Sequence, residues 1–202
     1  WHPFFLQGTK TLAYELWEDL GFRAPDNVIV PCGAGSNVLG CEIGFAELLR
    51  AGAIDTLPRI FAAQPAVCAP IAAALLGTDE AEAGGAFGDA PPDHAPPDRW
   101  PLGPTIAEGT AIARPVRLRE VVGALLSTGG GAVMLEEAEI AQATRDLARQ
   151  GLYVEPTCAQ VAAAYARLLE SGAIEPGQTT VLVLTGSGLK ATPVIERLLA
   201  AG

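Results

Sequence analysis

Residues 28–45, VIVPCGAGSNVLGCEIGF, carry the strongest chemical signal in the chain. A β-branched apolar run leads into Gly33 and Gly35, and a helical pattern begins at Ser36 or Asn37. The glycines let the backbone turn sharply and approach a ligand closely. The first amides of the following helix have no helical acceptors, and together with the helix dipole they favour an anion such as a phosphate group. The Ser36 and Asn37 side chains add further donors.

Two common nucleotide-binding motifs do not fit this turn. A Walker A loop has a lysine after its last glycine, whereas Cys41 follows Gly40 here. A dinucleotide-binding turn has a third Gly or Ala where this chain has Val38, and an acidic residue where this chain has Gln64. A single phosphate monoester remains as a ligand. The alternative, a turn that needs glycine only for its geometry, also remains open.

A second glycine turn, TGSG, begins at Thr185 after the apolar run 181–184. The Thr185 hydroxyl can reach a ligand of the first turn if the two preceding strands are close neighbours in a sheet. Alternatively, the hydroxyl bonds only to the backbone of its own turn. The residue pattern alone leaves both interpretations open.

The cysteines and histidines of the chain give little support for a metal site or a histidine-dependent catalytic triad. The four cysteines form no C-x-x-C pair and lie among apolar or small residues, which predicts reduced core positions rather than disulfides or a metal site; they are Cys32, Cys41, Cys68 and Cys158. The two histidines are His2, beside the terminus, and His94, in a proline-rich stretch. Triads that depend on histidine are therefore disfavoured.

Composition narrows the choice of partner. The 202 residues are 50% hydrophobic, with a mean hydropathy of +0.29 and a net charge of −10, so nucleic acid is an unfavourable partner. No apolar run approaches the roughly 20 residues that cross a bilayer, and the start lacks the pattern of a signal peptide. We therefore expect a cytoplasmic protein. The chain begins with an apolar segment at Trp1 and without Met, and we therefore expect it to be a piece of a larger protein.

Hydrophobic periodicity predicts an α/β fold in which strands alternate with helices. Strands are expected at 28–30, 59–64, 131–135 and 180–184. Helices are expected from a Thr9 or Thr11 cap to residue 20 and at 36–49, 68–76, 118–126, 136–149, 157–169 and 192–199. Such alternation is typical of a three-layer sandwich, a mostly parallel sheet with helices on both faces. We expect a single domain over 1–202, interrupted by a long Pro/Gly-rich surface loop at 78–104.

Six ordered blocks give the chain a family resemblance: KTLAYELWEDLG, PDNVIVPCGAGSN, GFAELLRAGAIDTLPRIFAAQPAVCAPI, TIAEGTAI, LYVEPTCA and VLVLTGSGLK. In this order they resemble the carboxyl-terminal part of the threonine synthases, which are pyridoxal-phosphate enzymes of fold type II, in the tryptophan-synthase-β group. The resemblance covers nearly the whole chain outside the 78–104 loop. It implies a lyase of threonine biosynthesis that converts O-phosphohomoserine and water to threonine and phosphate.

The resemblance also implies roles for particular residues. The family's phosphate-binding loop corresponds to Gly33, Ala34, Gly35, Ser36 and Asn37. Ala34 and Ser36 depart from its more glycine-rich pattern, but backbone amides carry the binding. Thr185 corresponds to the hydroxyl partner of the pyridine nitrogen, which leaves that nitrogen largely neutral. Glu108 and Glu155 match acidic positions near the site, and for both a structural role is the expectation.

The lysine that binds the cofactor aldehyde lies upstream in the family, in an S-F-K-D-type segment. This chain contains only Lys10 and Lys190, and neither has that context. We therefore expect the chain alone to be inactive and to need the amino-terminal half of the same protein as its partner. No catalytic residue and no metal ligand is assigned within these 202 residues.

Two other hypotheses remain. The cofactor could serve a serine/threonine dehydratase or a cysteine-synthase-like reaction, which use the same architecture. Alternatively, the chain is a degenerate, non-catalytic module, for which exposed apolar surface predicts self-association into a homo-oligomer. The KTLAYE, TIAEGTAI and VEPT blocks favour threonine synthase.

Overall fold

The computed structural model describes residue 2 and residues 4–82 and 103–200. Four strands form one parallel sheet in the order β3-β2-β1-β4. The strands are β1 (Asn27–Pro31), β2 (Arg59–Pro65), β3 (Gly131–Leu135) and β4 (Thr180–Leu182). The α-helices are α1 (Phe5–Thr9), α2 (Thr11–Asp19), α3 (Ser36–Arg50), α4 (Pro70–Glu82), α5 (Leu118–Ser127), α6 (Glu137–Arg149), α7 (Pro156–Glu170) and α8 (Thr192–Ala200). Short 3₁₀ turns are η1 (Ala66–Cys68), η2 (Glu108–Thr110) and η3 (Gly188–Ala191).

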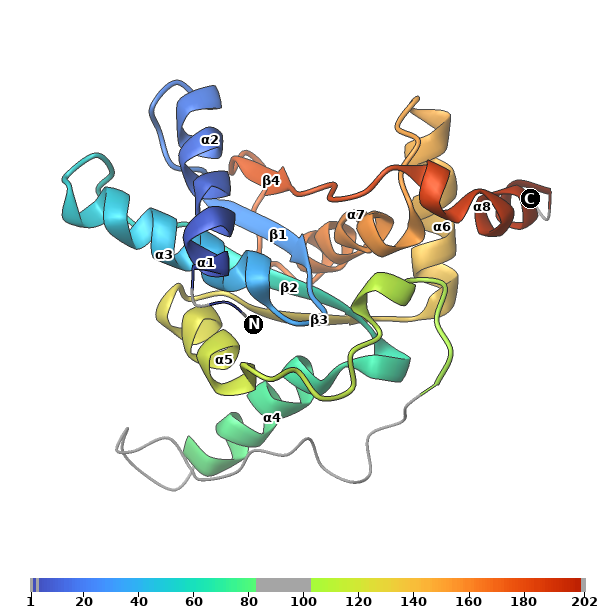
Figure 1. Cartoon of the computed structure of the whole chain (residues 1–202), viewed down its shortest axis with the longest axis horizontal. Helices are drawn as coiled ribbons and strands as arrows, with labels where there is room; N and C mark the ends of the chain where they lie inside the picture. The colour runs from blue at the N-terminus through green and yellow to red at the C-terminus, as the bar shows by residue number, and fades with distance from the viewer. Residues whose placement is uncertain (1, 3, 83–102, 201–202) are drawn as a thin grey trace.

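Helices cover both faces of the sheet, as the alternating side chains of the strands require. Val28 and Ile60 face one core cluster, which they share with residues of α1–α5. Ile29 and Phe61, one residue later in each strand, face the other cluster, built with α6 and α7. Figure 1 shows α1, α2, α3 and α5 on one side of the sheet and α6 and α7 on the other. The predicted three-layer α/β class is confirmed.

The central strands are fully enclosed, whereas β4 is not. All five residues of β1 are buried, in keeping with its uninterrupted apolar run. The equally apolar run 181–184 is half-buried, because β4 lies at one edge of the sheet and pairs only with β1. Its strand ends at Leu182 rather than at the predicted residue 184, although the Val183 amide still donates to the Ile29 carbonyl at 3.0 Å.

Two helical regions also differ from the sequence prediction. Helix α4 continues to Glu82, so the first five residues of the predicted 78–104 loop are helical. Residues 83–102, including His94, lie outside the described part of the chain. The predicted first helix, from a Thr9 or Thr11 cap to residue 20, corresponds to α2; the preceding helix α1, which meets α2 at Lys10, was not predicted. In the described ranges no helix has both the length and the apolar character to cross a membrane.

Candidate functional site

The first glycine turn lies where β1 ends and α3 begins. The Cys32 amide makes the last sheet bond, to the Ala63 carbonyl at 3.0 Å. Gly35 then takes a left-handed conformation, with φ of +83°, and serves as the N-cap of α3. A Cβ at Gly35 would also overlap the Val121 side chain on α5. Glycine is therefore required here for two reasons: it tolerates the positive φ, and it leaves room for the Val121 side chain.

Gly33 is held against a segment distant in sequence. A Cβ on this buried residue would lie 3.0 Å from the Gly109 carbonyl oxygen and 3.1 Å from Ile112 Cδ1. The η2 turn and the residues after it thus form one wall of the glycine turn. This contact was not predicted from the sequence.

Among the described residues, no acceptor is recorded for the amides of the turn. Residues 33–38 donate no recorded backbone hydrogen bond to any described residue, and the first helical bond runs from the Leu39 amide to the Gly35 carbonyl at 3.0 Å. The N-cap residue, Gly35, has no side chain to cap this end of α3. Orphan amides beside the positive end of a 15-residue helix form a site suited to an anion.

The second glycine turn lies beside the first. Strand β4 pairs with β1 in parallel, with Asn27 opposite Thr180 and Ile29 opposite Leu182. Both turns therefore leave the carboxyl edge of the sheet from neighbouring strands, where ligands of open α/β sheets bind. Thr185 is exposed at this edge. The predicted proximity of the two strands is confirmed, and the binding roles of residues 33–37 and Thr185 remain predictions.

The start of α7 holds the second turn in place. The Gly186 amide donates to Cys158 Sγ at 2.8 Å, and the same sulfur lies 3.1 Å from Thr185 Oγ1. The Glu155 amide donates to the Gly186 carbonyl at 3.2 Å, and a Cβ at Gly186 would overlap the Glu155 carboxylate. Glu155 therefore has a structural contact, as expected, at the beginning of α7.

The cysteines are free and buried, as predicted. Burial raises the pKa of the Cys32 and Cys41 thiols to about 12, so neither is a thiolate at neutral pH. Burial is also the main cause that raises the pKa of Cys158. The sequence pattern predicted Cys158 only as a core residue and gave no sign of its contact with Thr185. Within the described ranges no cluster of His, Cys, Asp or Glu could hold a metal.

The two lysines have different surroundings. Lys10 Nζ lies 2.9 Å from both carboxylate oxygens of Glu47, which also accepts a hydrogen bond from Tyr14. Glu47 is ten residues beyond Asn37 on α3, about 15 Å along the helix axis. Lys190 is exposed in η3, after the second turn.

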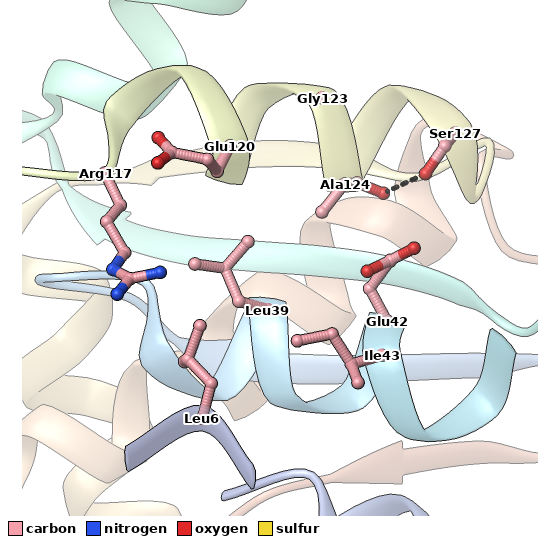
Figure 2. A pocket seen from close by; sticks show the side chains of 9 residues that line it. All are labelled: Leu6, Leu39, Glu42, Ile43, Arg117, Glu120, Gly123, Ala124 and Ser127. Atoms are coloured by element: carbon pink, nitrogen blue, oxygen red, sulfur yellow. Dashed lines mark hydrogen bonds between the residues drawn. The ribbon is translucent and has the colours of Figure 1, made fainter. Parts of the chain in front are cut away.

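A separate hollow of about 450 Å³ lies between α3 and α5 (Figure 2). Leu39 and Ile43 of α3 face it from one side, and Glu120 and Ser127 of α5 from the other. The Ser127 hydroxyl is committed to the Ala124 carbonyl at 3.1 Å. The lining includes neither glycine turn, so we place the candidate site at the sheet edge instead.

Comparisons with known proteins indicate the family to which the chain belongs. A family model described as a pyridoxal-phosphate dependent enzyme matches residues 1–186. The threonine synthase of Methanocaldococcus jannaschii is 35% identical over 190 residues, which make up 94% of this chain and 43% of that protein. The threonine synthase of Mycobacterium bovis is 31% identical, over 94% of this chain and 46% of its own. The chain thus spans less than half the length of these relatives.

Solved structures show the same fold. An L-serine ammonia-lyase from Rhizomucor miehei matches with a TM-score of 0.70 at 19% identity, over 98% of this chain and 57% of its own. A threonine deaminase from T.th. matches with a TM-score of 0.62 at 25% identity, over 92% of this chain and 57% of its own. The family model and the identity to the threonine synthases show that the chain belongs to the family of pyridoxal-phosphate dependent enzymes.

Proposed function

We propose that the turn at residues 33–37 binds the phosphate group of pyridoxal 5′-phosphate. The observation that carries this proposal is the run of backbone amides at 33–38 without an acceptor among the described residues. The two glycines let the turn pack closely against Ile112 and Val121, which an added Cβ would contact or overlap. A phosphate monoester accepts several such hydrogen bonds, and the positive end of α3 favours its charge.

Thr185 is the proposed partner of the cofactor's pyridine nitrogen. Its hydroxyl stands at the same edge of the sheet, after the strand next to β1. A hydroxyl, unlike a carboxylate, leaves the ring nitrogen largely neutral and so moderates its electron-withdrawing power. When bound, pyridoxal phosphate supplies an electron sink for carbanions formed on an amino acid. The residues of this chain hold and orient it.

The proposed reaction of the intact protein converts O-phosphohomoserine and water to threonine and phosphate. Its support is the 30–35% identity to threonine synthases over most of this chain. The reaction needs a lysine for the cofactor aldehyde, and Lys10 is engaged by Glu47. We therefore propose that the amino-terminal half of the longer protein supplies this lysine and the rest of the substrate pocket.

The phosphate proposal can be tested on the chain itself. Pyridoxine 5′-phosphate lacks the aldehyde, so its binding needs no lysine. We expect its titration, followed by amide NMR, to shift the signals of residues 33–38 first, and Gly35→Ala to weaken binding at least tenfold. Gly123→Ala is the matched control, because Gly123 is exposed in α5 with no atom within 4 Å of an added Cβ. Equal affinity of the two variants would refute the proposal.

A second candidate reaction is the deamination of serine or threonine. It is favoured by the structural match to the threonine deaminase at 25% identity. The two candidate reactions, if catalysed by the longer protein, would form different products. Phosphate and threonine in equal amounts from O-phosphohomoserine would support the first, whereas ammonia and a 2-oxo acid from threonine would support the second.

A further inference from the structure

The Thr185 side chain is fixed by a single recorded contact. It is exposed, and within the described part of the chain its hydroxyl oxygen has one polar neighbour, Cys158 Sγ at 3.1 Å. A hydroxyl rotates freely unless a partner orients it. The direction of the hydrogen bond between these two atoms therefore decides whether the Thr185 hydroxyl is available to a ligand as a donor or as an acceptor.

The surroundings of Cys158 favour one direction. The thiol is fully buried and its pKa is raised, chiefly by desolvation, so it keeps its hydrogen at neutral pH. The Gly186 amide donates to the sulfur at 2.8 Å, which uses the sulfur as an acceptor. The other oxygens in reach of the thiol hydrogen are farther than Thr185 Oγ1: the Gly186 carbonyl at 3.5 Å and Glu155 Oε1 at 3.8 Å.

We propose that Cys158 is a positioning residue that donates its S–H to Thr185 Oγ1 and so turns the Thr185 hydroxyl hydrogen outward. This inference rests on the proposed role of Thr185 toward the pyridine nitrogen. With its oxygen already accepting, Thr185 acts as the donor and the ring nitrogen as the acceptor. A donor bond to the nitrogen lone pair stabilises the neutral ring and lowers the pKa of its protonated form.

The opposite direction of the Cys158–Thr185 hydrogen bond would shift the pKa of the ring nitrogen in the opposite sense. If Thr185 donated to the sulfur, its oxygen would be free to accept from a protonated ring nitrogen, which would raise the pKa of that nitrogen. The protonation of a bound ring therefore reports the direction of the Cys158–Thr185 bond. Loss of structure around Cys158 would not reproduce this signature, because it would change affinity rather than the sign of a pKa shift.

The experiment uses the whole chain and pyridoxine 5′-phosphate labelled with ¹⁵N in its ring. The ¹⁵N chemical shift of the bound ligand is followed from about pH 5 to about pH 9, which gives the pKa of the ring nitrogen. We expect this pKa to lie below that of the free ligand, and Cys158→Ala to raise it by roughly one unit. Cys158→Ser keeps a donor and should restore the lowered value, whereas Thr185→Val should abolish the effect. Cys68→Ala, which removes a buried thiol elsewhere, is the control.

The charged side chains of the two elements that meet here are tested separately. Glu155 begins α7, and Lys190 lies in η3. Glu155→Gln and Lys190→Gln should leave the Cys158→Ala shift intact. If either reproduces that shift, or if Cys158→Ala leaves the ring pKa unchanged, the positioning role is wrong while the phosphate site stands. If wild-type chain does not bind the ligand at all, the proposed function fails and this inference with it.

Discussion

The candidate site requires a residue without a side chain at Gly35. Its positive φ and its contact with Val121 are separate constraints, and an alanine would violate both. We expect Gly35→Ala to lower the free energy of unfolding by about 2–4 kcal/mol, as the sum of backbone strain and overpacking. Urea denaturation of the wild type and the variant measures this change.

A second substitution separates the two causes. Val121→Ala removes the methyl groups that an alanine at 35 would overlap. Added to Gly35→Ala, it should recover the overpacking part of the loss but leave the backbone strain, so the double variant should be less unstable than the sum of the single changes. Strict additivity would show that Val121 does not limit this position.

At the scale of elements, the site is the meeting of the β1–α3 turn with η2 and α7. Gln160 of α7 is fully buried, and its Nε2 donates to Thr110 Oγ1 at 3.1 Å and to the Thr157 carbonyl at 2.7 Å. The Gly109 amide donates to Thr157 Oγ1 at 3.1 Å. These bonds fix the segment on which Gly33 packs. Helix α7 thus supports both glycine turns, the first through η2 and the second through Cys158.

Removing Gln160 should therefore weaken both stability and phosphate binding. Gln160→Ala leaves buried acceptors unpaired and opens a cavity beside η2, for an expected loss of about 2–4 kcal/mol. The matched control is Gln142→Ala on the exposed face of α6, expected within about 0.5 kcal/mol of wild type. Urea denaturation and titration with inorganic phosphate measure the two effects. Wild-type phosphate affinity in folded Gln160→Ala would contradict the support role of η2.

A different contact joins α2 to α3 and should make stability depend on pH. The hydrogen bonds from Tyr14 and Lys10 hold the pKa of Glu47 below its ordinary value of 4.5. A lowered carboxyl pKa stabilises the fold above pH 4.5, and this contribution disappears as pH falls through the folded value. The bond to Glu47 raises the pKa of Lys10 above 10.5, so its contribution is present below that pH and disappears as pH rises through the folded value.

The expected result is a difference between wild type and Glu47→Gln that is largest between these two limits. Unfolding free energies at intervals from about pH 3 to about pH 11 should converge at both ends, because each end removes one charge of the pair. Glu18→Gln, an exposed change on α2, is the matched control. A difference independent of pH would mean that packing, not charge, carries the Glu47 contribution.

Local pattern explains which elements could be predicted. The β1–glycine–α3 unit is encoded in one continuous segment, residues 27–50, so its strand, turn and helix were all recovered from sequence. The end of α4 was missed because TDEAE, after Gly77, carries no apolar periodicity. The wall formed by η2 and the Cys158–Thr185 contact both join residues far apart in the chain. Such contacts arise from tertiary packing, which a local pattern does not contain.

At the scale of the whole molecule, the groups that we propose to hold the cofactor lie at one edge of the sheet. Both candidate groups lie at one edge, on neighbouring strands: the amides of 33–38 and the Thr185 hydroxyl. Of the two lysines in the sequence, Lys10 is paired with Glu47 on the helical layer and Lys190 is exposed in η3. We therefore predict that the chain holds the cofactor without bonding it covalently.

This division gives the last prediction. Pyridoxal phosphate added to the purified chain should bind through its phosphate, yet develop no stoichiometric absorbance band of a specific covalent adduct, because Lys10 is paired with Glu47 and Lys190 is exposed with no recorded partner among the described residues that would hold its amine at the site. Absorbance spectra of wild type, Lys10→Ala and Lys190→Ala should be the same after dialysis. Inorganic phosphate should compete with the bound ligand in all three, which shows that the phosphate site is formed. A band at one equivalent that one lysine variant loses would overturn this prediction, and would assign to that lysine the role we place in the amino-terminal half.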